Sequence, residues 1–458
     1  MRHLVRRGVV VIVCLFMGGA LASSGRLVAR YLHTAAASAA PLSSTGIRVQ
    51  GRQASTARRI ETTLTYTSLD APGAGEASAP MVWDDSWFER DETEYNHELA
   101  RAASVLSSLA YSESGHYQNP AEVPAYMEHA LSALGFSEVD TGSYRFRSEV
   151  VDEVLNLVTD DADAVAYTVA RKRVSGASDD CASGESPAGH REGGDGVMTF
   201  GSSSIAPRDV IVVSIRGSYG SEWVSNLDLS RDEEDDHGGY VRAAHEVVSR
   251  LESMIASSHL EGSDVSVLLV GHSRGGAVAN LVASELDGRR AHAVASRDRV
   301  YAYTFASPAT TLNRAAHDER YANIFNIINP ADIMPSLPLR AWGYERYGVD
   351  LTLPSEGTPG HTSLDARMRS EYERSVGVVC AADSGDARVV KEVISDISAR
   401  VGSADDLVTP RGAAAVLRAT ALRVNPARLL HSHYPSTYIC WMQVVEEGDL
   451  GMTAWELG

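Results

Sequence analysis

The pentapeptide Gly271-His272-Ser273-Arg274-Gly275 places a serine between two glycines. An apolar stretch with the pattern of a buried strand, VSVLLV, runs directly into it, and a small-residue helical stretch, GGAVANLVA, runs directly out. Glycines let the backbone turn sharply here and expose the serine hydroxyl, as at the nucleophilic serine of a strand-turn-helix elbow. The pattern therefore predicts that Ser273 is a nucleophile. A glycine-rich turn without a chemical role is the alternative, and the strand and helix on either side favour the nucleophile.

Asp332 is the predicted acid partner of this serine. A serine hydroxyl needs a base, usually a histidine held by a carboxylate, and the chain order on such sheets is serine, acid, histidine. The strand pattern NIFNIIN ends at Pro330-Ala331-Asp332, so Asp332 is expected just past the carboxyl end of a strand, where active crevices lie. Asp350, in the alternating stretch YGVDLTL, is the rival, and a capping or turn role is the alternative for Asp332.

Three histidines follow Asp332 in the chain: His361, His431 and His433. His361 lies in a predicted loop, TPGHTS, whereas His431 and His433 directly precede the apolar helical stretch TYICWMQVV. A loop histidine that enters a helix can hang over the strand ends. We choose His433 as the base and keep His431 as its competitor, because spacing alone does not decide between them.

Short apolar strands and helices alternate around these residues. Strands are expected at 165–174, 209–215, 265–270, 300–305 and 324–329, and helices at 94–110, 121–134, 240–255, 275–286, 387–401 and 413–423. This alternation predicts the α/β class, with a mainly parallel sheet flanked by helices on both faces.

The N-terminal residues predict export. Arg2, Arg6 and Arg7 precede an apolar run, Gly8–Ala22, that ends in a sequence suited to signal-peptidase cleavage. The run is shorter than the roughly 20 residues of a spanning helix, so 1–22 is a signal peptide or a retained anchor. Residues 23–80 have the composition of a disordered Ala/Ser/Thr-rich spacer, and 81–458 form the folded domain, with an irregular insertion at 175–206. We expect an extracellular or cell-surface protein.

The charge balance excludes some partners. The formal net charge is −19, with 60 acidic and 41 basic residues, which argues against binding to nucleic acid. A neutral lipid surface remains open, because apolar contacts dominate there. Neither a metal nor a cofactor is expected, and the acidic run 232–236 is interpreted as a solvated loop. The oligomeric state stays open.

The four cysteines, Cys14, Cys181, Cys380 and Cys440, show no zinc-site spacing. Leaving aside Cys14 in the apolar run, they allow one disulfide and one thiol, or three thiols.

Four segments together resemble the class 3 lipase family, the fungal-lipase-like α/β-hydrolases. They are VIVVSIRGSYGSEWVSNL followed by HGGY, then VLLVGHSRGGAVANL, VYAYTFASPATTLN and NIFNIINPADIMPSLP. The stretch HYPSTY, from His433 to Tyr438, is similar to the histidine-then-tyrosine pattern of bacterial members, which favours His433. Arg274 departs from the leucine common in fungal members, and the stretch 354–430 is long.

The resemblance implies an α/β-hydrolase fold and further site residues. Ser218 would offer its backbone N–H and hydroxyl to an oxyanion, with the backbone N–H of Arg274 as the other donor. Trp223, Val224 and Leu227 fall on one helical face and would form a lid that covers the site in water and opens onto lipid. A helix packed permanently in the core is the alternative.

These residues predict an exported serine ester hydrolase of lipase type, which cleaves triacylglycerols or other carboxylic esters through an acyl-enzyme. A phospholipase and a short-chain esterase are the close alternatives. A catalytically inactive binding protein on the same fold is the alternative outside enzymes.

Overall fold

A computed structural model of the chain describes residues 58–69, 76–121, 123–146, 165–174, 208–218, 236, 238–260, 265–288, 294–421 and 423–452. Its central sheet has eight strands in the order β10-β9-β8-β7-β6-β5-β4-β3. Strands β5 to β9 are parallel, and the edge strands pair antiparallel. The bounds are β3 Glu138–Asp140, β4 Tyr167–Val174, β5 Arg208–Ile215, β6 Val265–His272, β7 Val300–Phe305, β8 Ile324–Ile328, β9 Val349–Thr352 and β10 Gly451–Met452. The predicted α/β-hydrolase class with a mainly parallel sheet is confirmed.

The central strands are near-continuous apolar runs, as expected where both faces of a sheet are covered. All eight residues of β6 and all six of β7 are buried. Two large apolar clusters, one on each face, form the core around these strands.

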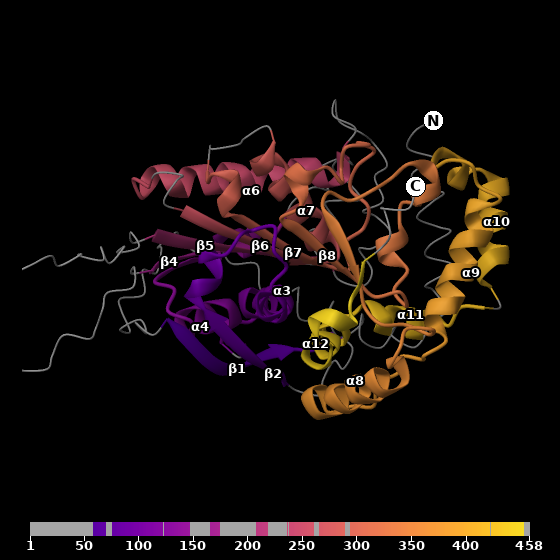
Figure 1. Cartoon of the computed structure of the whole chain (residues 1–458), viewed down its shortest axis with the longest axis horizontal. Coiled ribbons are helices and arrows are strands. Elements are labelled where there is room, and N and C mark those ends of the chain that lie inside the picture. Colours follow the sequence, from indigo (N-terminus) through magenta and orange to yellow (C-terminus); the bar gives the residue numbers. More distant parts are fainter. Residues whose placement is uncertain are drawn as a thin grey trace, which may run out of the picture.

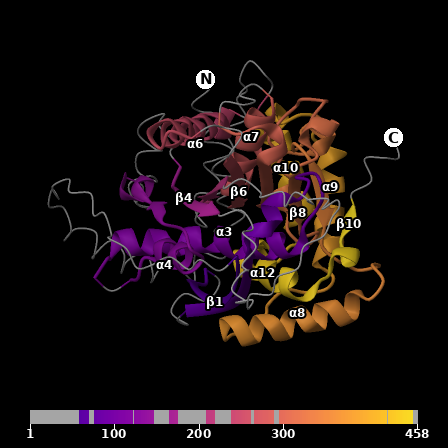
Figure 2. The same cartoon turned by 60° about the vertical axis from the view of Figure 1, so that its left-hand side comes forward.

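Helices α6 (Gly238–Ser257) and α7 (Arg274–Asp287) cover one face of the sheet (Figure 1). The other face is covered by α3 (His97–Gln118) and α12 (Pro435–Val444). Helix α8 (His361–Val376) packs on α12, and Figure 2 shows it running beneath that helix. The short helix α4 (Tyr126–Ala133) packs on α3.

Helix α3 begins where its sequence offers a cap and runs past its predicted end at 110. The side chain of Asn96 accepts the backbone N–H of Leu99, which satisfies one of the free donors at the helix start. The helix extends to Gln118 because Tyr111, Ser112 and Glu113 are also buried against the fold.

The prediction that 23–80 is a disordered spacer is wrong for its last part. Residues Arg59–Thr67 (β1) and Glu76–Asp84 (β2) form an antiparallel pair. Their inward positions alternate, but most of the inward side chains at the start of β2 are alanines, and β1 is rich in threonine. Small and hydroxylated side chains give a weak apolar signal, so the alternation did not stand out from the composition.

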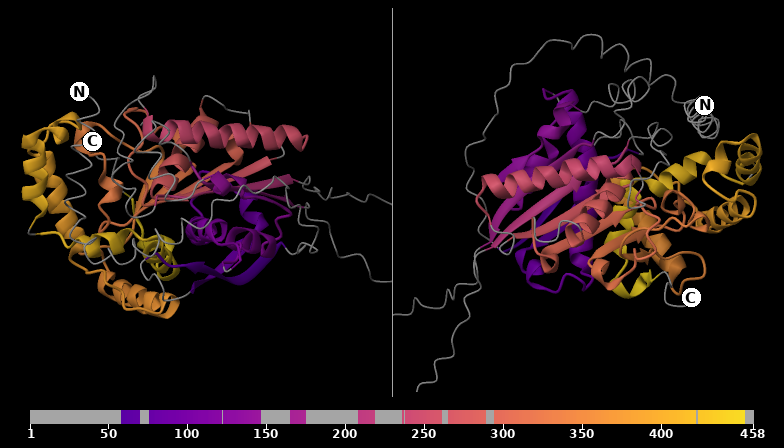
Figure 3. Two further views of the ribbon diagram at one scale, coloured as in Figure 1. Left: turned by 180° about the vertical axis from the view of Figure 1, so that it is seen from behind. Right: turned by 90° about the horizontal axis from the view of Figure 1, so that it is seen from above.

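Helices α9 (Asp386–Ser398) and α10 (Pro410–Thr420) form a separate layer beyond the sheet, at one end of the molecule (Figure 3). They share a small apolar cluster with Leu339 and with the partly buried Ile333, Leu337 and Trp342 of the segment after β8. Helix α11 (Pro426–His433) then leads to α12.

Within the described ranges, no helix has the length and apolar character needed to cross a bilayer. The predicted export segment 1–22 and the predicted insertion 175–206 lie outside the described residues.

Candidate active site

The parallel strands end in register at one edge of the sheet. Ile215 of β5 pairs with Gly271 of β6, and Phe305 of β7 pairs with both His272 of β6 and Ile327 of β8. The residues that follow these strands therefore meet at the carboxyl edge, where ligands bind in open α/β sheets. Ser218, Ser273 and Asp332 all lie just past this edge.

Ser273 occupies a strained turn between β6 and α7. Its backbone has φ 57° and ψ −128°, which non-glycine residues rarely adopt. The turn is held at both ends: the Ser273 N–H donates to the carbonyl of Phe305 at 2.8 Å, and the Ser273 carbonyl accepts the N–H of Ala277 at 3.0 Å. A Cβ on Gly275 would lie 2.2 Å from the carbonyl oxygen of Ile215, so only glycine fits at this close approach.

Three predicted site residues lie in one hydrogen-bonded row. His433 Nε2 lies 2.9 Å from Ser273 Oγ, and His433 Nδ1 lies 2.8 Å from Asp332 Oδ2. A carboxylate can only accept, so Nδ1 carries the proton and Nε2 is the acceptor for the serine hydroxyl. All three residues are buried, with exposed fractions of 2–3%. The arrangement can move a proton from Ser273 to His433.

Helix geometry separates His433 from its competitor. The two histidines are the sixth and last residues of α11, rather than part of a loop as expected. Residues two apart on a helix point in nearly opposite directions, because each residue turns the chain by about 100°. His431 Nε2 accordingly faces Cys380 Sγ at 3.3 Å and accepts the N–H of Ala381 at 3.2 Å.

Asp332 receives two further hydrogen bonds. Its Oδ1 accepts the N–H of Met334 at 2.9 Å, and its Oδ2 accepts the hydroxyl of Tyr438 at 2.9 Å. The Tyr438 oxygen in turn accepts the N–H of Asn329 at 3.1 Å. Burial raises the pKa of Tyr438 well above its ordinary value, and the charge of Asp332 adds to the effect. The phenol therefore stays protonated and donates. The sequence marked Tyr438 only as part of a pattern, without this role.

His272, inside the pentapeptide, links the turn that carries Ser273 to the end of α11 that carries His433. Its Nε2 lies 2.7 Å from the carbonyl oxygen of His433, and its Nδ1 lies 3.0 Å from the hydroxyl of Tyr111. Burial lowers the pKa of His272 well below its usual value, and the neighbouring His433 adds to this, so the ring is neutral. A carbonyl only accepts, so Nε2–H donates to His433 and Nδ1 accepts from Tyr111. Spacing gave no signal for this contact.

Of the two predicted oxyanion donors, Arg274 directly follows Ser273, and Ser218 lies just past the end of β5, the strand next to β6. Ser218 is 5% exposed and follows the end of β5. Arg274 begins α7, and the first N–H groups of a helix lack partners within it. A Cβ on Gly217 would lie 1.9 Å from the Tyr111 hydroxyl oxygen and 2.5 Å from the His272 carbonyl oxygen. The backbone just before Ser218 therefore packs closely against Tyr111 and His272. The predicted lid residues Trp223, Val224 and Leu227 lie outside the described residues.

The rival residues have other surroundings. Asp350 lies within β9 and pairs with Arg346, while His361 begins α8 and stacks on Trp441 with ring centroids 6.3 Å apart. In the described part of the chain, no group of three or more His, Cys, Asp or Glu side chains is arranged to hold a metal ion.

Cys380 and Cys440 are buried and are not joined to one another, and Cys181 lies outside the described residues.

A known protein family matches the part of the chain that forms this edge of the sheet. Residues 212–342 match the family model described as Lipase (class 3), which spans Ser218, Ser273 and Asp332.

Among solved structures, the chain is similar to a triacylglycerol lipase described as having a serine-protease triad at its catalytic centre (24% identity, TM-score 0.28, 32% of this chain and 58% of that one). It is also similar to the Rhizomucor miehei lipase in complex with its propeptide (25%, 0.27, 31% and 49%) and to a mono- and diacylglycerol lipase from Aspergillus oryzae (24%, 0.27, 33% and 60%). The chain thus spans about half to three-fifths of the length of these lipases.

Proposed function

We propose that the chain is a serine hydrolase of carboxylic esters from the class 3 lipase family, whose model residues 212–342 match. The observation that carries the proposal is the row from Ser273 Oγ through His433 to Asp332, with contacts of 2.9 and 2.8 Å at the carboxyl edge of the sheet. Ser273 is the nucleophile, His433 the general base and Asp332 the residue that orients the imidazole.

Acylation follows from the tautomer of His433. As the Ser273 oxygen attacks the ester carbonyl, its proton passes to Nε2 of His433. Asp332 keeps Nδ1–H in place and stabilises the imidazolium that forms. The carbonyl oxygen becomes negative and is held by the backbone N–H groups of Arg274 and Ser218 together with the Ser218 hydroxyl.

Acylation ends when the imidazolium gives its proton to the departing alcohol, which leaves an acyl group on Ser273. Deacylation uses the same residues: water attacks this ester while His433 accepts a proton from it. Collapse of the second tetrahedral intermediate returns the proton to Ser273 and releases the carboxylic acid.

Lipid esters of the triacylglycerol class are the proposed substrates. The support is the match of residues 212–342 to the class 3 lipase model. Phospholipids and short-chain esters would undergo the same chemistry. Initial rates on emulsified trioctanoin, dioctanoyl phosphatidylcholine vesicles and p-nitrophenyl butyrate decide among the three, and the highest kcat/KM identifies the class.

Ser273→Ala tests the nucleophile directly. Loss of a serine nucleophile costs on the order of 10⁶-fold in kcat, so hydrolysis of p-nitrophenyl butyrate should fall to background. A fluorophosphonate probe should label the unsubstituted protein at Ser273 alone, as read by peptide mass spectrometry.

Ser284→Ala is the matched control, because the hydroxyl of this buried serine of α7 donates to the carbonyl of Leu281 in its own helix at 2.9 Å. It should keep both labelling and rate. If the folded, unsubstituted protein neither takes up the probe nor hydrolyses any ester, the inactive binding protein is the correct reading.

We also propose that the protein is exported. The support is the basic start at Arg2, Arg6 and Arg7, followed by the apolar run to residue 22. Expression of the full chain, cell fractionation and determination of the N-terminal residue distinguish a cleaved signal from a retained anchor. Recovery only from the cytoplasm would refute export.

A further inference from the structure

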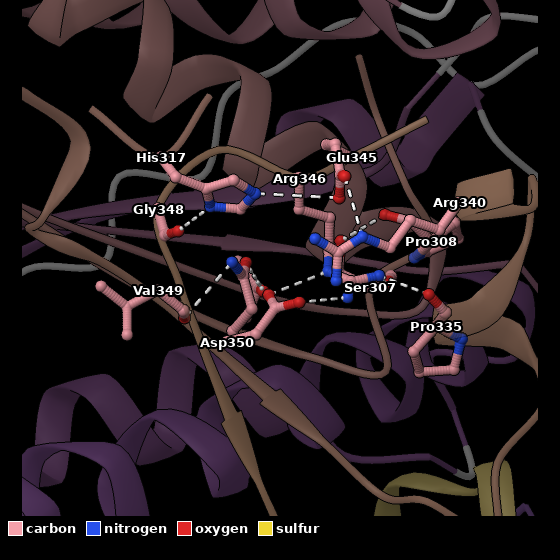
Figure 4. Close-up of polar contacts among 12 residues, drawn as sticks. Ser307, Pro308, His317, Pro335, Arg340, Glu345, Arg346, Gly348, Val349 and Asp350 are labelled. Carbon is pink, nitrogen blue, oxygen red and sulfur yellow. Dashed lines mark hydrogen bonds and ion pairs between the residues drawn. The ribbon is translucent and has the colours of Figure 1, made fainter. Parts of the chain in front are cut away.

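A buried ion pair lies outside the Ser273–His433–Asp332 row. Arg346 and Asp350 form a two-pronged pair, with Nε to Oδ1 at 3.1 Å and Nη2 to Oδ2 at 2.5 Å. Their side chains are 10% and 3% exposed. Figure 4 shows the guanidinium facing the Asp350 carboxylate. Both charges are thus removed from water, which is costly.

The remaining arm of the guanidinium reaches two main-chain carbonyls. Arg346 Nη1 donates to the carbonyl of Ser307 at 3.2 Å and to the carbonyl of Pro335 (Figure 4). Ser307 follows β7. Pro335 lies in the 3₁₀ turn Met334–Ser336, three residues after Asp332. One side chain therefore links the segment that follows β7 to the segment that carries Asp332.

The link to Asp332 is short. Asp332 Oδ1 accepts the N–H of Met334 at 2.9 Å, and Met334 directly precedes the residue whose carbonyl Arg346 holds. A movement of Arg346 would thus be transmitted through Pro335 and Met334 to the hydrogen bond on Asp332 Oδ1.

Bulk stabilisation does not account for this arrangement. Well-packed apolar side chains generally replace a buried ion pair without loss of stability. They cannot donate to the two carbonyls. Only a planar, permanently charged group with several fixed N–H directions can hold the carboxylate and both carbonyls at once.

We infer that Arg346 and Asp350 form a positioning pair that fixes the segment carrying Asp332 and thereby aligns the Asp332–His433 hydrogen bond. Asp350 orients Arg346, and Arg346 holds the carbonyls of Ser307 and Pro335. Neither residue touches the substrate. The expected change in kcat rests on the proposed ester hydrolysis. The expected alignment of the Asp332–His433 hydrogen bond does not.

The kinetic test uses Asp350→Asn. Asparagine is nearly isosteric but has lost the charge and one of the two acceptors for the guanidinium. A displacement of about 1 Å in a catalytic group can cost about 10²-fold, so we expect kcat on p-nitrophenyl butyrate to fall 10- to 100-fold. KM should change by less than about threefold, because the pair does not contact the substrate. Arg346→Lys keeps the positive charge but loses the planar pair of N–H donors. It should lower kcat by a similar factor, again with little change in KM.

Asp85→Asn is the matched control. Asp85 pairs with Lys172 at 2.8 Å, and both side chains are 5% exposed, so an equally buried ion pair is broken. Lys172 lies on the antiparallel strand β4, away from Asp332. This variant should lower the urea midpoint of unfolding while kcat stays within about twofold of the unsubstituted protein.

A second measurement does not depend on hydrolysis. The proton on His433 Nδ1, in a short bond to a carboxylate, should give a far-downfield ¹H NMR signal, assigned by its loss in Asp332→Asn. We expect the signal to shift or disappear in Asp350→Asn and to stay in Asp85→Asn. If the unsubstituted protein hydrolyses no ester, the proposed function fails, and this signal still tests the positioning pair. Unchanged kcat and an unshifted signal in folded Asp350→Asn and Arg346→Lys would overturn the inference.

Discussion

The burial of Asp287 leads us to expect that the protein loses stability as the pH rises. It is the last residue of α7, at the opposite end of that helix from Ser273, and is 7% exposed. Its Oδ1 accepts the side-chain N–H of Asn323 at 3.2 Å, whereas its Oδ2 has no hydrogen-bond partner among the described residues. Burial raises the pKa of Asp287 from 3.8 to about 8. The folded protein therefore favours the neutral carboxyl group.

The sign of the effect follows from proton binding. The folded state holds the Asp287 proton more tightly than the unfolded chain, so the free energy of unfolding falls as pH rises from about 4 through about 8. Each unit of pKa difference corresponds to about 1.4 kcal/mol. The difference of about four units thus sets an upper limit of roughly 6 kcal/mol on the stability lost by pH 9.

Asp287→Asn removes this titration while keeping the acceptor for Asn323. We expect the variant to unfold at higher urea than the unsubstituted protein at pH 9, by an amount that shrinks at pH 7 and disappears near pH 4. Tryptophan fluorescence in urea at each pH gives the free energies. Ester hydrolysis per folded molecule should not change, because Asp287 is remote from the carboxyl edge.

Asp396→Asn is the control for charge removal as such. Hydrogen bonds from Arg400 and Arg423 lower the pKa of Asp396, so its removal should give no gain at pH 9. If Asp287→Asn were less stable than the unsubstituted protein at pH 9, the carboxylate would be ionised and paired in the folded state, and the reasoning from burial would be refuted.

Two further substitutions test the surroundings of the serine. Tyr438→Phe removes the hydroxyl between Asp332 and the Asn329 N–H, so it should lower kcat and cost about 1–3 kcal/mol of unfolding free energy. Nitrophenyl ester kinetics and urea unfolding measure both, and an unchanged kcat would show that the phenol only packs. Gly217→Ala would press a Cβ against the Tyr111 hydroxyl and a backbone carbonyl, so we expect about 1–3 kcal/mol of destabilisation and a loss of kcat of about 10²-fold in the same assays. Wild-type kinetics in this variant would show that the segment can relax.

Much of the sheet and the elbow was predictable because their signals are local. The stretches that became β5, β6 and β7 are near-continuous apolar runs, as is usual for buried parallel strands, and their observed bounds differ from the predicted ones by at most two residues. The glycines around Ser273 and the proline after β8 mark the turns directly. Candidate residues at strand ends could therefore be placed on one edge without any knowledge of tertiary contacts.

The histidine could not be chosen in this way, because its position depends on a helix whose direction is set by packing. His431 and His433 are equivalent in spacing, and only the orientation of α11 turns one toward Ser273 and the other toward Cys380. The same limit hid the contact between His272 and the carbonyl of His433, which joins residues far apart in sequence. A different limit hid β1 and β2: threonines in β1 and the inward alanines Ala77 and Ala79 of β2 give a weak apolar signal.

The two candidate acids show what decides between them. Asp332 and Asp350 both belong to the β8–β9 side of the sheet, both are buried, and both accept hydrogen bonds from a nitrogen base. The difference lies in the partner. Imidazole can take up and release a proton near neutral pH, so a carboxylate beside His433 can support general-base chemistry. A guanidinium keeps its charge at any pH that the fold survives, so a carboxylate beside Arg346 can only fix a position. The sequence placed Asp332 past a strand end and Asp350 within a strand, but the donor that sets the chemistry of each acid is identified only by the fold.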